Sequence, residues 1–216
     1  MRVAAIDCGT NSIRLLVLSG SRKAPVELVR EVRLARLGQG VDATGEFHPD
    51  ALARTFAVCE EYARIIREHG AEKVRFVATS AARDVSNRRL LVDGVRERLG
   101  VEVDVIPGQE EARLSSMGAL CALDVASPTL VVDIGGGSTE LVLVDGAGTI
   151  LHSVSLNVGA VRLRERFLHT DPPTPGERKN ARGFVGELLD GSGIDFAAVA
   201  GAVGVAGTVT SVGARV

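Results

Sequence analysis

Short apolar runs separated by turns of small polar residues are the first regular pattern along the chain. Residues 2–7 form one such run, a Gly-Thr-Asn-Ser turn follows it, and residues 13–18 form a second run. Two strand-like runs joined by a short turn favour a β-hairpin. The pattern therefore predicts a hairpin at the N-terminus with polar groups at its turn, and a further strand over residues 26–34.

A helical spacing of apolar positions begins after these strands. Apolar residues in the segment 48–70 recur at intervals of three or four positions, and Gly70 ends the pattern, so a helix is predicted there. The other elements expected in the first half alternate between strand and helix: strands over 73–79 and 101–106, and helices over 87–99 and from Gln109 onward. Alternation of this kind is typical of a sheet covered by helices.

The same order of elements restarts at Thr129 with a second hairpin. The elements expected after it are helices around 159–168 and 176–190, separated by the breaker "DPPTP", and a strand over 202–206 that leads into the turn "GVAGTVTS". Between the halves, "ALDVASP" at 122–128 interrupts the helical pattern. The chain is therefore predicted to have an α/β fold of two similar lobes, 1–125 and 126–216, built around the two hairpins.

The two hairpins also resemble each other in sequence. When "AAIDCGTNSIRLLVLSG" at 4–20 is placed on "LVVDIGGGSTELVLVDG" at 130–146, the segments align without a gap. The shared positions include an acid, a glycine and a serine of each turn: Asp7 with Asp133, Gly9 with Gly135, and Ser12 with Ser138. This agreement in register indicates that one structural unit occurs twice.

Each repeated turn has the properties of a phosphate-binding loop. A strand that ends in Asp-x-Gly and turns through small residues places several backbone N–H groups in one concavity, which a phosphate can approach closely. The hydroxyl groups of Thr10, Ser12, Ser138 and Thr139 add neutral donors. A single glycine-rich turn could simply close a hairpin. Two turns in register, each after a buried Asp, favour the interpretation that two lobes hold phosphates from opposite sides.

The acids of these hairpins indicate a divalent cation. A carboxylate beside a phosphate repels it unless a cation lies between them. The candidates for holding magnesium are Asp7, Asp133 and Glu140. Glu140 aligns with Arg14, and this exchange suits two hairpins with different roles, one binding metal and the other binding a phosphate oxygen. Arg14 could alternatively be a surface charge on a strand face.

Composition and charge restrict the class of protein. Hydrophobic residues make up 45% of the chain but aromatic residues only 3%, so the core must consist mainly of Val, Leu, Ile and Ala, which suits a buried α/β sheet. A net charge of −2 gives no electrostatic reason to expect binding to nucleic acid or to an anionic membrane. The three cysteines and four histidines have no metal-ligand spacing. Without a signal peptide or a membrane-length apolar run, a soluble protein of the reducing cytoplasm is expected.

Four motifs together resemble one protein family. They are "DCGTNSIRLLV" at 7–17, "ATSAARDVSN" at 78–87, "PGQEEARLSSMG" at 107–118 and "DIGGGSTELVLVD" at 133–145. Their order and spacing resemble the exopolyphosphatase / guanosine pentaphosphate phosphohydrolase (Ppx/GppA) family of the actin-like ATPase superfamily, over essentially the whole chain. The resemblance implies two actin-like (ribonuclease H-like) lobes with mixed sheets flanked by helices. Because family members usually continue well beyond the counterpart of Val216, it also implies that the second lobe is incomplete here.

The segment "GQEEARL" at 108–114 contains the candidate catalytic acid. Glu110 and Glu111 are predicted in the first turn of a helix, where acids gain from the helix dipole, so both could be ordinary surface charges. The resemblance implies instead that Glu111 activates the attacking water, whereas Glu110 remains a first-turn charge. Whether Glu111 acts as a base with a raised pKa or positions a metal-activated water stays open.

The resemblance also implies residues that contact the substrate. Arg83, in the second motif, matches a family position that contacts the phosphate chain. The resemblance therefore implies that Arg83 is catalytic together with Glu111. The alternative is that Arg83 is a surface arginine at the start of a helix. A guanidinium can bind two phosphate oxygens at once. The segment "VGVAGTVTSVG" at 203–213 resembles the third glycine turn of the superfamily, which lies near the nucleotide. The full set predicted to bind phosphate or substrate is Gly9, Thr10, Asn11, Ser12, Arg14, Gly135, Gly136, Gly137, Ser138, Thr139, Gly207 and Thr208.

The function predicted from the motifs and the resemblance is a magnesium-dependent phosphohydrolase. Water activated by Glu111 would release the terminal phosphate from inorganic polyphosphate in a cleft between the lobes, and the same site could cleave guanosine pentaphosphate. Two alternatives stay open: a phosphotransferase with ADP or another nucleotide as acceptor, and a non-catalytic regulator that binds polyphosphate or an alarmone. The resemblance also implies a homodimer in the full-length form, with no nucleic acid or membrane partner.

Overall fold

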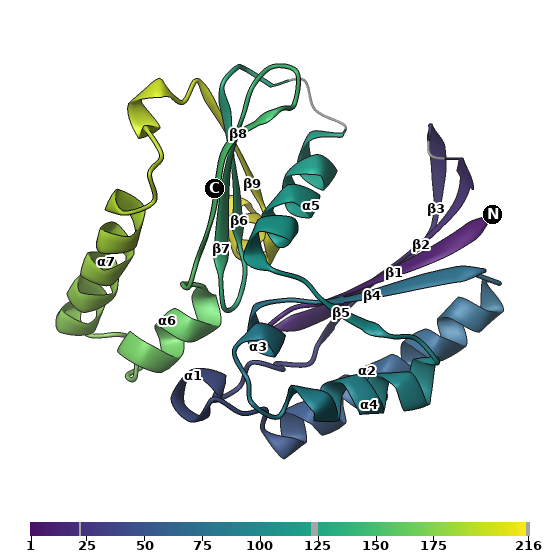
Figure 1. Ribbon diagram of the computed structural model, residues 1–216. Helices are drawn as coiled ribbons and strands as arrows, with labels where there is room; N and C mark the ends of the chain where they lie inside the picture. Colours follow the sequence, from purple (N-terminus) through teal and green to yellow (C-terminus); the bar gives the residue numbers. More distant parts are fainter. Residues whose placement is uncertain (22, 122–124, 215–216) are drawn as a thin grey trace. The chain divides into compact units, whose positions relative to one another are not determined.

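The computed structural model describes residues 1–21, 23–121 and 125–214, which form two compact units (Figure 1). The first unit is Met1–Ile106, and the second begins at Pro107. Each unit has its own mixed β-sheet and its own hydrophobic core. Each therefore has the features of a separate folded lobe.

The first unit is built on a five-stranded sheet of the order β3-β2-β1-β4-β5. Strand β1 pairs antiparallel with β2 and parallel with β4. The strands are β1 (Arg2–Cys8), β2 (Ser12–Ser21), β3 (Ala24–Leu34), β4 (Lys73–Ala78) and β5 (Val103–Val105). The helices are α1 (Val41–Thr44), α2 (Pro49–Glu68), α3 (Ser80–Arg83) and α4 (Arg88–Leu99).

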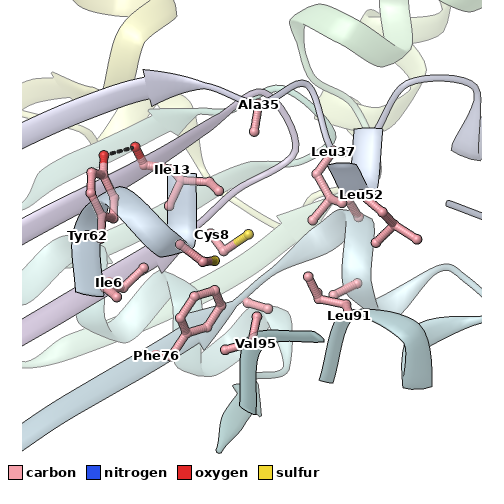
Figure 2. Packing of buried hydrophobic residues seen from close by; sticks show 14 of the residues in the cluster. Ile6, Cys8, Ile13, Ala35, Leu37, Leu52, Tyr62, Phe76, Leu91 and Val95 are labelled. Atoms are coloured by element: carbon pink, nitrogen blue, oxygen red, sulfur yellow. Dashed lines mark hydrogen bonds between the residues drawn. The ribbon is translucent and has the colours of Figure 1, made fainter. Parts of the chain in front are cut away.

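The core of the first unit lies between this sheet and the helices α2 and α4 (Figure 2). Side chains of β1 alternate between the two faces, as strand geometry requires, so Ile6 and Cys8 are buried in the core whereas Asp7 is on the other face. Tyr62 of α2 is fully buried, and its hydroxyl donates a hydrogen bond of 2.9 Å to the carbonyl of Ile13. This bond attaches α2 to the start of β2, next to the turn of the first hairpin.

The second unit is built on a four-stranded sheet of the order β8-β7-β6-β9. Strand β6 pairs antiparallel with β7 and parallel with β9. The strands are β6 (Thr129–Ile134), β7 (Thr139–Val144), β8 (Ile150–Leu156) and β9 (Gly201–Val205). The helices are α5 (Gly108–Leu120), α6 (Ala160–Phe167), α7 (Pro175–Asp190) and α8 (Ala206–Gly213), with a 3-10 turn η1 (Phe196–Ala198).

Both faces of the second sheet are covered, with α5 on one side and α6 and α7 on the other (Figure 1). On the α5 side, Ala112 of the helix packs with Val131, Val142 and Val144 of the sheet. The opposite face contains Leu130, Leu141, Leu156 and Val158, packed against Leu163, Phe184 and Leu188. Because neighbouring residues of one strand are buried on opposite faces, β6 and β7 have the continuous apolar sequence of a fully buried sheet.

The predicted fold class is confirmed, since both units combine a mixed sheet with flanking helices. Four strands of each sheet correspond in order, β3-β2-β1-β4 with β8-β7-β6-β9, and β5 has no counterpart in the described part of the second unit. Strand β8 was not among the predicted elements. No helix of the described residues combines the length and the apolar character needed to cross a bilayer.

The division between the units falls at Ile106 and Pro107, earlier than the predicted boundary at residues 125 and 126. The reason is the packing of α5, whose Ala112 is buried against Val131 of the second sheet. The predicted boundary rested on the break in "ALDVASP", of which residues 122–124 lie outside the described residues. The helix with the two glutamates therefore belongs to the second unit.

The segment "GVAGTVTS", predicted as a turn, is mostly helix. Strand β9 ends at Val205 and α8 begins at Ala206 without an intervening loop. The change of direction is made at Ala206 alone, which has a φ of 68° in the left-handed region. The small residues of this segment suggested a loop, but they allow the strand to pass directly into a helix.

Candidate active site

The sequence repeat is also a structural repeat. In the first hairpin Asp7 of β1 lies opposite Arg14 of β2, and in the second hairpin Asp133 of β6 lies opposite Glu140 of β7. The first glycine turn (residues 9–12) and the second glycine turn (residues 135–138) are closed in the same way, by one backbone hydrogen bond of 3.0 Å each: Gly9 N to Ser12 O, and Gly135 N to Ser138 O. Equivalent residues of the two copies therefore occupy equivalent places.

The glycine turns present backbone donors. In the described part of the chain, the N–H groups of Gly136, Gly137 and Ser138 donate to no protein acceptor. The same holds for the N–H groups of Thr10 and Asn11 in the first glycine turn. Consecutive backbone donors in a turn form a concavity suited to an anion such as phosphate. Both glycine turns thus have consecutive backbone donors, and phosphate binding by them stays a prediction.

The hydroxyl groups of the second hairpin have partners within the unit. Thr139 donates a hydrogen bond of 2.6 Å to the carbonyl of Val158. The Ser138 hydroxyl is close enough to the Glu140 side chain to lower the pKa of that carboxyl group. These two hydroxyl groups, predicted as phosphate donors, therefore hold the hairpin and its carboxylate in this structure.

Three carboxyl groups gather beside the second glycine turn. Glu140 is only 2% exposed and accepts a hydrogen bond of 2.8 Å from the Ser155 hydroxyl of β8. Asp133, opposite Glu140 in the sheet, accepts a hydrogen bond from the Ser115 hydroxyl of α5. Glu111 lies four residues before Ser115 and so on the same face of α5.

This gathering of acids changes the ionisation of Glu140. Burial, the negative charge of Glu111 and, less strongly, that of Asp133 together raise the pKa of Glu140 to about 7, against the lowering effect of hydrogen bonds from Ser155 and Ser138. Desolvation and like charges both favour the neutral carboxyl group. A buried group of this kind in a cluster of acids is typical of a functional site, and its ionised form would be favoured by a cation.

The two glutamates of α5 have different surroundings. Glu110 makes a bidentate ion pair with Arg113, with distances of 2.7 and 2.8 Å from the two carboxylate oxygens to the guanidinium. Glu111 is half-buried and close enough to Glu140 for its charge to raise the pKa of that residue. Glu111 therefore faces the acid cluster, whereas Glu110 is part of a surface pair.

Beside its glycine turn, the first unit has arginine side chains where the second unit has the acid cluster. Arg14 Nη1 lies 3.7 Å from Asp7 Oδ2 across the first hairpin, and both side chains are partly exposed. Arg83 is the last residue of α3, and its Nη1 donates a hydrogen bond of 3.0 Å to the carbonyl of Ile106. Helix α3 follows β4, the parallel neighbour of β1, so Arg83 lies near the sheet edge that carries the first glycine turn.

The third glycine segment lies near the equivalent edge of the second sheet. Gly207 and Thr208 are in the first turn of α8, which follows β9 directly. Strand β9 runs parallel to β6, with Val205 beside Asp133. The carboxyl ends of adjacent parallel strands are a common position for ligands in α/β sheets. These two residues therefore lie on the Asp133 side of their unit.

The three predicted metal ligands are divided between the units. Asp133 and Glu140 lie together in the second unit, and Asp7 is in the first. Across the described residues, no three His, Cys, Asp or Glu side chains form a group that could hold a metal ion by themselves. Magnesium usually takes one or two carboxylates and completes its shell with water and substrate phosphate. Asp133 and Glu140 fit that donor set.

Two serines of the site were not predicted from the sequence. Ser115 and Ser155 each donate to one of the clustered acids, Asp133 and Glu140. Ser115 could have been found, because its spacing of four residues from Glu111 places both on one helix face. Ser155 could not, because it is on β8, a strand that was not predicted.

Comparison with known proteins places these features in context. The chain matches the Ppx/GppA phosphatase family over residues 17–214. It is 49% identical over 225 aligned positions to Exopolyphosphatase 2 of Mycobacterium tuberculosis, covering 99% of this chain and 70% of that protein. It is 34% identical over 167 positions to the guanosine-5'-triphosphate,3'-diphosphate pyrophosphatase of Photobacterium profundum, covering 76% of this chain and 33% of that protein. The crystal structure of an exopolyphosphatase-like protein superposes with a TM-score of 0.95 at 43% identity, covering 99% of this chain and 68% of that one.

Proposed function

Because the chain belongs to the Ppx/GppA phosphatase family, we propose that it releases the terminal phosphate of inorganic polyphosphate with water as the acceptor. In this role the chain is an exopolyphosphatase-type hydrolase of phosphoanhydride bonds. The observation that carries the proposal is the cluster of Glu111, Asp133 and Glu140 beside the second glycine turn. Hydrolysis of this bond needs a positioned water, a proton acceptor and compensation of phosphate charge, and the cluster combines candidates for these tasks.

Magnesium is the proposed cofactor, with Asp133 and Glu140 as its protein ligands. The fit rests on the buried Glu140 carboxyl group, whose ionised form is disfavoured by burial and by neighbouring acids and would be favoured by a divalent cation. When bound, the ion neutralises charge on the phosphate chain. Asp7, which pairs with Arg14 in the first hairpin, is the third proposed contributor.

Glu111 is the proposed base. It accepts a proton from the attacking water while the water oxygen forms a bond to the terminal phosphorus. The bond from that phosphorus to the bridging oxygen breaks, and the shortened chain leaves with the electron pair. The products are orthophosphate and a polyphosphate one unit shorter. Glu111 is suited to this task because its neighbour Glu110 is engaged by Arg113 and Glu111 is the one that faces the acid cluster.

The phosphate oxygens are held by backbone and guanidinium donors. In the second unit the donors are the N–H groups of Gly136, Gly137 and Ser138, which have no acceptor in the described part of the protein. In the first unit Arg14 and Arg83 supply charge-assisted hydrogen bonds, which are stronger than bonds between neutral groups. Donors fixed before the substrate arrives contribute to catalysis because they need not reorganise during the reaction.

The test is to measure orthophosphate release from long-chain polyphosphate with magnesium, with and without ADP. The proposal expects magnesium-dependent release of orthophosphate and no ATP. ATP in place of orthophosphate would make the chain a phosphotransferase. If neither product forms while polyphosphate raises the melting temperature, the chain is a non-catalytic binder.

Guanosine pentaphosphate is the second candidate substrate, favoured by the similarity to the Photobacterium profundum pyrophosphatase. It ends in a linear phosphoanhydride, as polyphosphate does, so the same donors would serve both. The two candidates are separated by comparing kcat/KM for each substrate under the same conditions. A cytoplasmic location and a homodimer of the full-length form stay predictions.

A further inference from the structure

We infer that Gly38 and Gly159 are a matched pair of positioning residues for the two glycine turns. Each lets a backbone segment pass directly against one turn, and that segment fixes the direction of the N–H groups of the turn. This role extends the proposed function and rests on it, because the N–H groups would hold phosphate. Neither glycine belongs to the repeated hairpin segments, so their common role is visible only in the folded chain.

In the second unit, the start of α6 covers the carbonyl side of the second glycine turn. Consecutive residues of α6 donate to the three carbonyls in order: Ala160 N to Gly135 O (3.0 Å), Val161 N to Gly136 O (2.9 Å) and Arg162 Nε to Gly137 O (2.9 Å). Gly159, directly before these donors, is buried against the turn. One helix start thus holds every carbonyl of the Gly-Gly-Gly segment.

In the first unit, the chain that follows β3 has the same position. Two of its backbone N–H groups donate to carbonyls of the first glycine turn: Gly38 N to Thr10 O (2.8 Å) and Arg36 N to Asn11 O (2.9 Å). Gly38 is buried, as Gly159 is. The two turns are therefore supported by different residues but in the same way.

The two contacts are equivalent by position. Gly38 meets Thr10, and Gly159 meets Gly136. Thr10 and Gly136 are counterparts, because each is the third residue after the aspartate of its hairpin. Gly38 follows β3 and Gly159 follows β8, which are corresponding edge strands of the two sheets. The duplicated unit therefore includes a supporting glycine in addition to the hairpin.

Lack of space is the reason for glycine at both positions. A Cβ atom at Gly159 would lie 2.5 Å from both the carbonyl carbon and the oxygen of Gly136. A Cβ atom at Gly38 would lie 2.2 Å from Thr10 Cγ2. The φ of Gly159 is −160°, an extended conformation that any residue adopts, so its backbone conformation does not require glycine.

The carbonyl contacts decide where the N–H groups point. In a planar trans peptide the C=O of one residue and the N–H of the next point in opposite directions. Holding the carbonyls of Gly135, Gly136 and Gly137 on the α6 side therefore turns the N–H groups of the following residues to the opposite side. These are the same three N–H groups, of residues 136–138, that have no acceptor in the described chain.

Alanine at Gly159 and alanine at Gly38 should differ in their effects, because the added Cβ atom meets backbone atoms at Gly159 and a side-chain methyl group at Gly38. At Gly159 the neighbours are backbone atoms of the turn, which can move only if the hydrogen bonds from α6 lengthen. At Gly38 the nearest neighbour is a methyl group, and without it the closest contacts are Thr10 O at 3.3 Å and Cβ at 3.4 Å. Replacing Thr10 by serine removes that methyl group, so Thr10→Ser should relieve Gly38→Ala.

The experiment compares wild type, Gly159→Ala, Gly38→Ala and Gly38→Ala with Thr10→Ser. Amide hydrogen exchange at Ala160 and Val161 is measured by NMR, and the dissociation constant of pyrophosphate with magnesium is measured by calorimetry. Gly159→Ala is expected to speed this exchange at least about tenfold and to weaken pyrophosphate binding by about tenfold. Gly38→Ala is expected to weaken binding similarly, and the added Thr10→Ser to restore most of it.

Two glycine variants control for general destabilisation. Gly94→Ala would place its Cβ 2.2 Å from the Phe56 ring in the core of the first unit, and is expected to lower the melting temperature without changing pyrophosphate affinity. Gly183→Ala in α7 meets no atom within 4 Å, so it should leave the affinity unchanged and, because alanine is the better helix former, should raise the melting temperature slightly. If Gly38 and Gly159 are positioning residues, pyrophosphate affinity should fall in the variants at these two glycines but not in Gly94→Ala, even though Gly94→Ala lowers the melting temperature.

The role is overturned if Gly159→Ala leaves either the exchange rates or the pyrophosphate affinity unchanged. It is also overturned if Thr10→Ser fails to restore Gly38→Ala, or if the wild-type protein does not bind pyrophosphate. Failure of the proposed function has a different signature: wild type that binds pyrophosphate but releases no phosphate from polyphosphate. In that case the affinity series still decides whether the two glycines position the turns.

Discussion

Asp133 and Glu140 lie directly opposite each other on β6 and β7, at the positions that Asp7 and Arg14 occupy in the first hairpin. In the first hairpin opposite charges pair, with 3.7 Å between the guanidinium and the carboxylate. In the second hairpin two acids meet, and Glu111 adds its charge. One duplicated hairpin therefore has a charge-compensated copy and a copy with excess negative charge. This difference underlies our proposal that the second copy binds the metal and the first binds phosphate oxygens.

Ionisation of the Glu140 carboxyl group should make the folded protein less stable as the pH rises. The pKa of Glu140 is about 7 in the folded protein against a reference value of 4.5, so the folded state binds its proton more tightly than the unfolded state. The stabilisation from protonated Glu140 is therefore fully present below the reference pKa of 4.5 and is lost as the pH rises through about 7. Without divalent cations, the free energy of unfolding of wild type relative to Glu140→Gln should fall by on the order of 3 kcal/mol, at about 1.4 kcal/mol per pKa unit. A difference between the two proteins that stays constant across this range would contradict the assignment.

Ser155 should control the same ionisation. Its hydroxyl donates to the Glu140 carboxylate at 2.8 Å and so lowers the pKa of that group. Ser155→Ala removes the donor, and the pKa of Glu140 should rise by about one unit, as expected for loss of one hydrogen bond to a charged group. Titration of the glutamate carboxyl carbon by NMR measures the shift. Ser153→Ala, on the same strand, is the control and should leave the pKa of Glu140 unchanged.

The hydrogen bond from Tyr62 to Ile13 should contribute to the stability of the first unit. Tyr62 is fully buried, and its hydroxyl donates to the carbonyl at 2.9 Å. Tyr62→Phe keeps the ring but removes the donor, and should reduce the free energy of unfolding in urea by about 1–2 kcal/mol. An unchanged unfolding midpoint would mean that the carbonyl of Ile13 finds another donor.

Helix α7 should depend on its N-cap. The Thr174 side chain accepts from Glu177 N, and the Glu177 side chain accepts from Thr174 N, which together form a capping box. Thr174→Ala should lower the free energy of unfolding by about 1 kcal/mol. Thr174→Ser keeps the capping oxygen and should lose much less. Equal losses in the two variants would show that the cap is not the source of the effect.

The sequence was sufficient to predict the parts of the fold that are encoded locally. The strands other than β8, the hairpins and the repeat could be predicted because apolar runs and the Asp-x-Gly turns are short-range signals. The alignment of Asp7 and Arg14 with Asp133 and Glu140 indicated two equivalent hairpins, and the structure gives both the same cross-strand register. These relationships needed no knowledge of how distant segments pack.

The remaining features depend on contacts between distant segments. The unit to which α5 belongs is decided by Ala112 packing on the second sheet, which a break in helical pattern at 122–128 could not indicate. The support of the glycine turns by Gly38 and Gly159 joins residues far apart in the chain. Ser155 reaches Glu140 only because β8 pairs with β7. Each of these contacts is made by tertiary packing.

The role of Glu111 as the base is tested most directly by the kcat of phosphate release from polyphosphate in Glu111→Gln compared with Glu110→Gln. Both variants remove one negative charge from the start of α5, but Glu110 is paired with Arg113 and Glu111 faces the acid cluster. We predict a loss of at least about two orders of magnitude for Glu111→Gln and less than about twofold for Glu110→Gln. Equal activity in the two variants would contradict the assignment of Glu111 as the base.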